Sequence, residues 1–359
     1  MSKKRGKRRI SKISIILITF IWLFALALVL ILLFNSLKHR NKLKEVKSKI
    51  TIPKGFYYVG GDIDTGVVIS DNQADEFKGT EYKVLNKLKG NQFVWVPVEK
   101  AIVNDYKEAV QMVNDEKIPI AVKTENGYVG LKYKFVTYLK KILVNDYIDE
   151  YNQEPYIVTS GGIYGDNEEY IEGSTKGLYQ ETFNKMVESV EKNKGFYISR
   201  YEVGNLTNAV KNNGKIVSKA GEEDITYMDW VNLYKVSHKM YDRDDITTEM
   251  IWGCQWDATL VWIAQNIDNR KYIFDTRLVG NFSNSKKKTA SSSEYGLNNI
   301  YDLAGNAYEW TQRGSIYGGK KAYGGYYGTK NFYTLDMTYM YPITYLWNEV
   351  GTRVTMYIN

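Results

Sequence analysis

The hydrophobic and polar positions separate a short apolar segment from a long mixed remainder. Residues 1–12 hold seven lysines and arginines and no acid. Residues 13–34 follow, and their only polar members are Ser14 and Thr19. At about 1.5 Å per residue, a helix of this length spans the roughly 30 Å hydrocarbon core of a bilayer. The pattern therefore predicts a transmembrane helix over 13–34, in preference to a buried helix of a soluble domain.

The flanks of this span indicate an uncleaved signal anchor. The run ends in Leu32-Leu33-Phe34-Asn35, without the small-residue pattern of a signal-peptide cleavage site. Six basic residues in the charged stalk, 35–50, nearly balance the seven before the span, so charge alone leaves the orientation open. A large C-terminal domain can translocate largely regardless of its charge. We therefore expect a single-pass cell-membrane protein with 1–12 in the cytoplasm and 51–359 outside the cell.

Beyond the stalk, the pattern alternates between short strands and amphipathic helices. Apolar helical spacing recurs at Phe183, Met186, Val187 and Val190 within residues 181–194. Strands are expected at 56–59, 67–69 and 91–98. Helices are expected to begin near the Thr226–Asp229 capping pattern and to cover 254–265. Pro97 indicates an edge strand or a strand end. Residues 268–298 are polar and are expected to form a long surface loop.

The stretch from Asn299 to Thr311, NIYDLAGNAYEWT, organises our interpretation of the remainder. Its polar residues are too closely spaced for a regular helix or strand, and Gly305 permits positive φ. We therefore expect a loop whose oxygens turn inward. Two carboxylates, Asp302 and Glu309, with carbonyls between them make a plausible site for a hard cation such as calcium. The alternative is a polar turn that precedes a buried Tyr308/Trp310 pair.

This stretch resembles the "GLYDMxGNVWEW" signature of the formylglycine-generating-enzyme family, also called the sulfatase-modifying-factor family. Five further segments resemble family motifs in the same order: IPKGFYYVGG (52–61), GFYISRYEV (195–203), TEMIWGCQWDA (248–258), GGYYGT (324–329) and GTRV (351–354). The resemblance implies an α+β fold, a variant of the C-type lectin fold, with twisted, mostly antiparallel sheets and flanking helices. It also implies a calcium site with Asp302, Gly305, Ala307 and Glu309 as ligands.

Residues from about 99 to 194 depart from the compact family pattern and are expected to be an insertion. Within it, residues 132–147 mix basic and aromatic side chains, KYKFVTYLKKILVNDY. Two interpretations remain open for this stretch. It is either a helix for a membrane surface or a partner, or an ordinary amphipathic helix of the domain.

The residues available for catalysis are few. Cys254 is the only cysteine, so an intrachain disulfide is excluded, and a buried inert thiol is expected there. The two histidines are His39, in the stalk, and His238, on a predicted helix. A protein zinc site draws on several Cys and His ligands, and no G-x-S-x-G elbow accompanies His238. The chain has so many carboxylates that no single pair can be identified as the general acid and general base of a catalytic site.

The family chemistry tests the enzyme hypothesis most directly. The resemblance implies that an active oxidase holds copper with two cysteines, and Thr329 and Thr334 occupy the matching positions here. Neutral hydroxyls do not replace thiolates as ligands for Cu(I). Related iron enzymes of this fold need histidine ligands, which the histidine count excludes. We therefore expect neither copper, nor catalytic residues, nor oxidase activity, with calcium as the expected metal.

Ligand binding is the expectation that remains. Seven tyrosines lie between Tyr323 and Tyr345 among glycines and polar residues, a composition typical of recognition surfaces. The alternative is that many of these rings are strand residues packed in the core. The residues expected to bind an unknown carbohydrate or protein ligand are Tyr326, Tyr327, Thr329, Tyr333 and Thr334.

The distribution of charge limits the partners. Residues 1–50 carry 13 of the 48 basic residues and one of the 41 acidic residues. The remainder therefore holds 35 basic and 40 acidic residues, a formal charge of −5, so nucleic acid is not an expected partner. The basic segment suits anionic lipid headgroups. We expect a membrane-anchored surface protein whose lectin-like domain binds a ligand. An enzyme of the family with unrecognised chemistry, or a structural component of a surface assembly, is the alternative.

Overall fold

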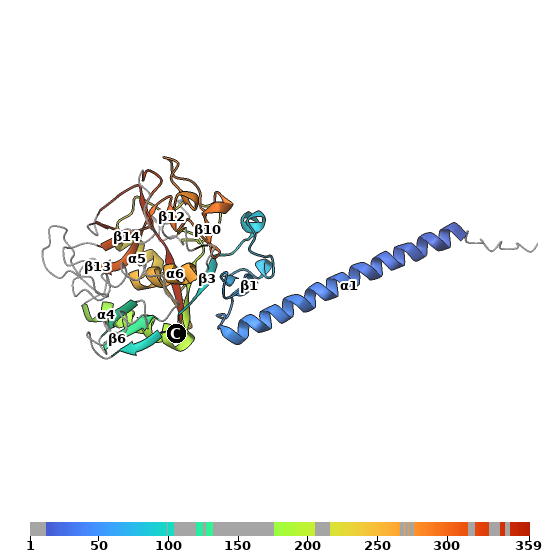
Figure 1. The fold of residues 1–359 in the computed structure, drawn as a ribbon, viewed down its shortest axis with the longest axis horizontal. Helices are drawn as coiled ribbons and strands as arrows, with labels where there is room; N and C mark the ends of the chain where they lie inside the picture. The colour runs from blue at the N-terminus through green and yellow to red at the C-terminus, as the bar shows by residue number, and fades with distance from the viewer. Residues whose placement is uncertain are drawn as a thin grey trace, which may run out of the picture. The chain divides into compact units, whose positions relative to one another are not determined.

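The computed structural model describes the backbone over most of the chain (Figure 1). The described residues are 12–98, 100–103, 120–124, 127–131, 176–204, 216–265, 269, 272, 276–314, 320–329, 338–341 and 345–359. Contacts divide the chain into two units, Met1–Lys49 and Ile50–Asn359.

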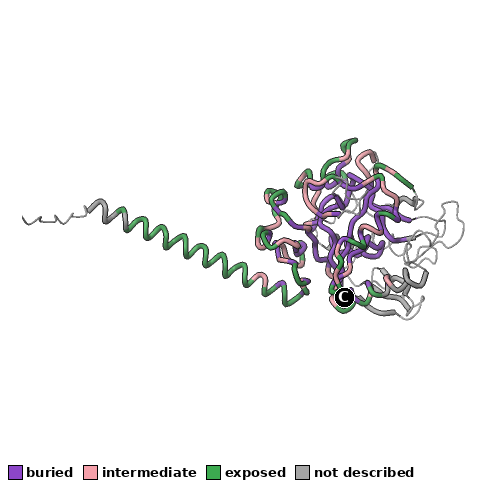
Figure 2. The backbone as a smooth tube through the Cα atoms, turned by 180° about the vertical axis from the view of Figure 1, so that it is seen from behind, coloured by how far each residue is buried: buried purple, intermediate pink, exposed green. Residues whose placement is uncertain are grey.

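The first unit contains one long helix. Helix α1, Lys12–Lys49, runs without interruption through both the predicted span and the stalk. No proline or glycine interrupts this sequence, so nothing in the chain ends the helix at Phe34. Among the described helices it is the one that is long and apolar enough to cross a membrane. The large apolar residues of the predicted span from Phe20 to Phe34 are exposed (Figure 2), which is compatible with an anchor.

The centre of the second unit is a six-stranded sheet in the order β1-β2-β3-β7-β17-β8. Neighbouring strands pair antiparallel throughout. Its strands are β1 (Tyr57–Gly60), β2 (Val68–Ser70), β3 (Gln92–Pro97), β7 (Gly195–Ser199), β17 (Val354–Ile358) and β8 (Ile246–Met250). Pro97 ends β3 opposite Gly195, in the interior of the sheet. The expectation of a strand end is therefore correct and that of an edge strand is wrong.

Three of the described helices pack around this sheet. Helix α4 (Lys176–Asn193) contacts β7 and β17, and Phe183 and Met186 on its apolar side are buried. Helix α5 (Trp230–His238) contacts β8. Helix α6 (Gly253–Gln265) contacts both β3 and the second sheet, so it lies between them (Figure 1). Among the described residues of this unit, the tryptophans that are almost fully buried include Trp95, Trp230, Trp252, Trp256 and Trp310.

The second sheet has the order β15-β14-β13-β16. Its strands are β15 (Thr338–Tyr341), β14 (Lys320–Tyr323), β13 (Tyr308–Gly314) and β16 (Val350–Thr352). Strands β13 and β16 pair in parallel and the other neighbours antiparallel. Because β16 is followed directly by β17, the last ten residues join the two sheets.

The expected insertion forms its own small sheet in the described part. Strands β4 (Lys100–Val103), β6 (Gly127–Leu131) and β5 (Ile120–Thr124) pair antiparallel. The remaining short elements are η1 (Gln73–Asp75), η2 (Tyr82–Lys87), η4 (Thr276–Leu278), β9 (Gly280–Asn281), η5 (Ser293–Tyr295), β10 (Gly296–Leu297), β11 (Ile300–Tyr301) and β12 (Ala304–Gly305). The basic and aromatic stretch 132–147 lies outside the described residues.

Two expectations about local structure are corrected. Helix α5 begins at Trp230, because Asp229 is its N-cap and accepts a hydrogen bond from the Asn232 amide at 2.7 Å. Thr226 lies before the helix, and the intervening Tyr227 has a φ of +61°. The expected surface loop 268–298 is partly internal. Asn281 in β9 is fully buried and lies opposite Gly305 of β12 in a parallel strand pair.

Candidate functional site

The organising stretch follows the expected turning path over its first half. Asp302, Gly305 and Asn306 all have positive φ, between +58° and +69°. These are the residue types that tolerate the left-handed region. From Tyr308 onward the chain enters strand β13, so the loop is shorter than expected. Every residue from Ile300 to Arg313 is buried.

The first polar contact of this stretch joins it to the end of the chain. Nε and Nη2 of Arg353 donate to the Glu309 carboxylate at 2.9 and 2.7 Å. The same guanidinium donates to the carbonyls of Ser199 and Tyr301 at 2.9 and 2.8 Å. Both partners are inaccessible to solvent. Three segments that carry family-like motifs therefore meet at one arginine.

The second polar contact joins the stretch to the segment after β7. Nδ2 of Asn306 donates to Oε2 of Glu202 at 2.6 Å, and the Ala307 amide donates to Oε1 at 3.2 Å. Oδ1 of Asn306 accepts from Asn281 Nδ2 and from the Lys287 amide, both at 2.9 Å. Both polar atoms of the Asn306 side chain are thus hydrogen-bonded, and they link residue 306 to residues 202, 281 and 287.

Carboxylates outnumber cations in this buried cluster, which we define as Glu202, Asp224, Asp302, Glu309, Lys286 and Arg353. Burial raises the pKa of Asp302 to about 7 from an ordinary 3.8, although the Ala290 amide donates to Oδ2 at 2.6 Å. Burial, with repulsion from Asp224 and Asp302, raises the pKa of Glu202 well above its usual range. Asp224 is held by Lys286 at 3.4 Å. Burial still raises its pKa.

The four expected calcium ligands lie along one buried turn, but their oxygens are differently engaged. Both Glu309 oxygens accept from Arg353, so a cation there would face a guanidinium. Oδ2 of Asp302 accepts from Ala290. Within the described ranges no group of three or more His, Cys, Asp or Glu side chains could hold a metal ion. A role for Glu309 in binding calcium therefore requires the ion pair with Arg353 to open, and calcium stays a prediction.

The expected ligand-binding tyrosines lie directly beside this turn. After β14, Gly324 and Gly325 have φ of +91° and +81° and reverse the chain. The Gly305 amide donates to the Gly324 carbonyl at 2.9 Å, and the Tyr327 amide donates to the Asn306 carbonyl at 3.1 Å. The loop that carries Tyr326 and Tyr327 is therefore held by the organising stretch.

Thr329 has a structural role in the same loop. Its Oγ1 accepts from the Tyr326 amide at 3.1 Å, and its own amide donates to the Tyr326 carbonyl at 2.9 Å. These two bonds close a tight turn in the backbone between Tyr326 and Thr329. Tyr333 and Thr334, the other expected ligand-binding residues, lie outside the described residues.

Tyr326 and Tyr327 belong to a run of half-buried rings. The ring of Tyr326 lies 5.5 Å from that of Tyr308 and 5.4 Å from that of Tyr327. Burial and the Glu349 carboxylate raise the pKa of the Tyr327 hydroxyl. Tyr323, in contrast, is fully buried and packs on Trp256, so the alternative of a core tyrosine is correct at that position.

The structure adds residues that were not expected in the site. Tyr227 is 62% exposed, and its amide donates to the Trp347 carbonyl at 2.8 Å. The rings of Trp347 and Tyr345 lie 5.5 Å apart. Glu349 contacts Tyr327 through its side chain, and its carbonyl accepts from the Tyr308 amide at 2.7 Å. The run TYLWNE just before the last family-like motif is the sequence signal that points to part of this group.

We call this surface the aromatic face and define it as Tyr227, Tyr326, Tyr327, Tyr345, Leu346, Trp347 and Glu349. Tyr345 and Leu346 are 43% and 48% exposed. Three loops that are distant in sequence supply its members. Large exposed or half-exposed rings, held by backbone hydrogen bonds, provide contact area without much loss of conformational freedom on binding.

Comparison with known proteins gives limited information. No protein-family model matches the chain, and no curated protein matches it. Among solved structures, CarF is 14% identical, with 46% of this chain and 87% of that chain covered and a TM-score of 0.37. Treponema denticola variable protein 1 is 10% identical, with 45% of this chain and 84% of that chain covered and a TM-score of 0.34. The P3c variant of the major tropism determinant is 12% identical, covering 46% and 51%, with a TM-score of 0.33.

These TM-scores are too low for the likenesses to carry an argument about function. The structure itself defines the class of the second unit as an α+β domain built on antiparallel sheets. It follows an N-terminal helix that is apolar enough to span a membrane.

Proposed function

We propose that the protein is a single-pass surface protein with a lectin-like domain of the formylglycine-generating-enzyme type. In this proposal the domain binds a carbohydrate or protein ligand through the aromatic face and has no copper oxidase activity. The observation that carries the proposal is the attachment of the aromatic face to the buried cluster. The Tyr327 amide donates to the carbonyl of Asn306, whose side chain holds Glu202.

This attachment supports binding because it makes the surface rigid before a ligand arrives. The two loops that carry Tyr326 and Trp347 leave β14 and enter β16, the strands on either side of β13. Backbone bonds join both loops to residues 306–308. Preorganised rings lose little entropy on binding, so more of the contact energy is retained as affinity.

Residue chemistry supports the absence of oxidase activity. Thr329 occupies one of the two positions where the family holds copper with cysteine, and its hydroxyl closes the turn at Tyr326. The sole thiol, that of Cys254, is buried on α6. A pair of thiolates for Cu(I) cannot be assembled from these residues. We therefore expect the copper-loaded protein to leave the cysteine of a sulfatase-type peptide unoxidised, and formation of formylglycine would contradict the proposal.

Binding is tested by screening the purified protein against immobilised glycans and surface proteins. Tyr327→Ala and Tyr227→Ala should each weaken a real ligand by about thirtyfold, the effect of removing a hot-spot ring worth about 2 kcal/mol. Tyr82→Ala is the matched control, because Tyr82 is 39% exposed on η2 and belongs to another surface. Equal binding by all three variants would place the ligand elsewhere. If no glycan or surface protein binds in the screen, a structural role for the domain is favoured.

A further inference from the structure

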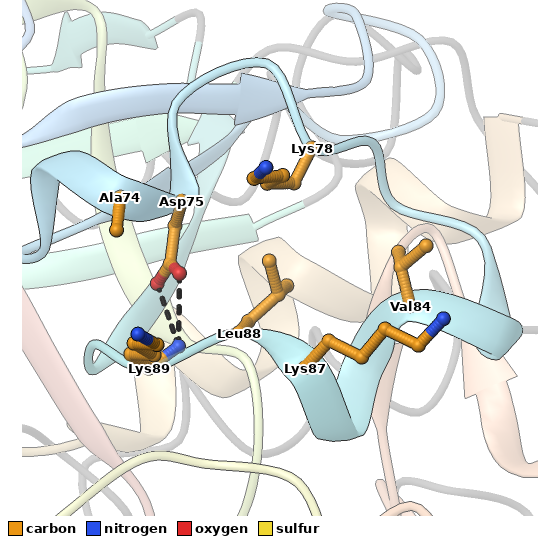
Figure 3. Close-up of a pocket in the computed structure, with 7 residues that line it drawn as sticks. All are labelled: Ala74, Asp75, Lys78, Val84, Lys87, Leu88 and Lys89. Carbon is orange, nitrogen blue, oxygen red and sulfur yellow. Dashed lines mark hydrogen bonds between the residues drawn. The ribbon is translucent and has the colours of Figure 1, made fainter.

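A cavity of about 270 Å³ lies between η1 and η2 (Figure 3), and none of its lining residues belongs to the aromatic face. It is lined by Ala74, Asp75, Lys78, Val84, Lys87, Leu88 and Lys89. Val84 stands on η2 and Leu88 follows that helix directly, with Lys78 above them in this view. The volume is slightly below the usual range for small-molecule sites, roughly 300–1,000 Å³, so only a small ligand fits.

Hydrogen bonds to the side chain of Asp75 hold the walls of the cavity together. The buried carboxylate of Asp75 accepts the hydroxyl of Ser70 at 2.7 Å and the amides of Lys89 and Gly90 at 2.9 and 2.8 Å. Asp75 thereby fastens η1 to the segment that follows η2. At Gly90 a Cβ atom would lie 2.2 Å from Ser70 Oγ, so the close approach depends on glycine. The walls are therefore held in place without a ligand.

Charge at the cavity is unbalanced. Lys78, Lys87 and Lys89 line it and are exposed. None of these three ammonium groups makes an ion pair or hydrogen bond with another described residue. The single acid in the lining, Asp75, directs both oxygens to internal donors. Three lysines thus line the cavity together with Val84 and Leu88, and the only carboxylate in the lining, that of Asp75, is already hydrogen-bonded to internal donors.

We propose that this cavity binds a small phosphate monoester with a short apolar body. The ammonium groups supply point charges for the phosphate, a role that lysine performs well. The apolar body covers Val84 and Leu88 and removes their surface from water. A soluble phosphate ester and the headgroup of a phosphatidic acid share this chemistry.

The test uses the full-length protein in a nonionic detergent, titrated with phenyl phosphate by calorimetry. At pH about 7.5 this probe carries close to two negative charges, because the second pKa of a phosphate monoester is about 6. One saturable site is expected in the millimolar range or tighter. Lys78→Gln and Lys87→Gln should each weaken binding about fivefold, the usual effect of one partly exposed ion pair. Added salt should weaken binding further.

Two variants distinguish binding in the cavity from non-specific attraction of the phosphate to surface lysines. Lys83→Gln removes an exposed lysine of η2 that does not line the cavity, and it should leave the affinity unchanged. Ala74→Leu keeps the charge but fills the cavity, and it should weaken binding at least fivefold while the melting temperature stays the same. Equal losses in Lys83→Gln and Lys78→Gln, or normal binding by Ala74→Leu, would overturn the proposal.

Competition experiments against phenyl phosphate identify the source and the chemical class of the natural ligand. Short-chain phosphatidic acid should displace phenyl phosphate if the natural ligand is a lipid headgroup, whereas short-chain phosphatidylcholine should not. Failure of both lipids to compete, with phenyl phosphate still bound, would identify a soluble phosphate ester. Benzoate, with a single charge, should bind more weakly than phenyl phosphate. Equal affinity for benzoate, or no saturation by phenyl phosphate, would contradict a phosphate site.

Discussion

Arg353 and Glu309 form a buried ion pair in which the guanidinium donates to both carboxylate oxygens, at 2.7 to 3.2 Å. The pair bridges β13 and the junction of β16 with β17, and so joins the two main sheets. Arg353 also donates to the carbonyls of Ser199 and Tyr301. Removal of either partner leaves a charge in the core without its counterpart, which is the costly case for a buried pair.

The first prediction therefore concerns stability. Arg353→Met should lower the free energy of unfolding by about 3–5 kcal/mol, because it strands the Glu309 carboxylate. The double variant Arg353→Met/Glu309→Leu should recover part of this loss. The control is Asp245→Asn, which removes the exposed pair with Arg243 and should cost less than about 1 kcal/mol. Urea unfolding monitored by tryptophan fluorescence measures all three. A loss below 1 kcal/mol for Arg353→Met would contradict the assigned role of the pair.

The second prediction concerns the pH dependence of stability at Asp224. Burial raises its folded pKa above the ordinary 3.8, against the opposing effect of Lys286. A group with a raised folded pKa loses its contribution to stability as the pH rises through that value. The wild type should therefore become progressively less stable than Asp224→Asn as the pH rises above about 4, the ordinary pKa of an aspartate. Thermal unfolding at a series of pH values measures the difference.

Asp245 provides a control of opposite sign. The hydrogen bond from Arg243 lowers the folded pKa of Asp245. Its contribution is present above the ordinary pKa and disappears as the pH falls through the folded value. Relative to Asp245→Asn, the wild type should gain stability as the pH rises, by a small amount because the pair is exposed. Slopes of the same sign for Asp224→Asn and Asp245→Asn would contradict the opposite pKa shifts of the two carboxyl groups.

The third prediction concerns calcium. If Asp302 and the adjoining turn bind the ion, a hundredfold excess over the dissociation constant should stabilise the fold by about 2.7 kcal/mol. A chelator should then lower the melting temperature of the wild type. Asp302→Asn retains an acceptor for the Ala290 amide but lacks the charge, so it should respond much less. An identical response of the two proteins would exclude Asp302 as a ligand.

The fourth prediction concerns membrane topology. The apolar helix α1 and the size of the C-terminal domain lead us to expect residues 51–359 on the outer face of the cell membrane. Protease added to intact cells should remove an epitope tag placed after Asn359 and leave one placed before Met1. Loss of the C-terminal tag only after permeabilisation would show the opposite orientation.

Sequence patterns were sufficient for elements that depend on local periodicity. Phe183 and Met186 recur on one side of α4 and are buried there, and the expected helix 254–265 matches α6 within one residue. The helical period is a local property, so tertiary contacts did not alter these assignments. The start of α5 was misplaced, because Thr226 and Asp229 are both good N-caps and only Asp229 lies where the helix begins.

The candidate site was predictable only in part. Tyr326, Tyr327 and Thr329 were expected near the organising stretch, and backbone bonds to Gly305 and Asn306 bring their loop there. Tyr227 was not expected, because its exposure depends on a loop held by Trp347, 120 residues further along the chain. The roles of Glu202 and Arg353 likewise depend on partners that local patterns do not reveal.

The sequence by itself determined the apolar helix, the helical faces, the position of the organising turn and the lack of paired cysteines. Each of these depends on residue type and local spacing. Only the tertiary structure decided that Glu309 pairs with Arg353, that Asn306 holds Glu202, and that three lysines surround one cavity. These relationships depend on which strands lie side by side. Strand pairing is set by burial and hydrogen bonding between segments that are distant in the chain.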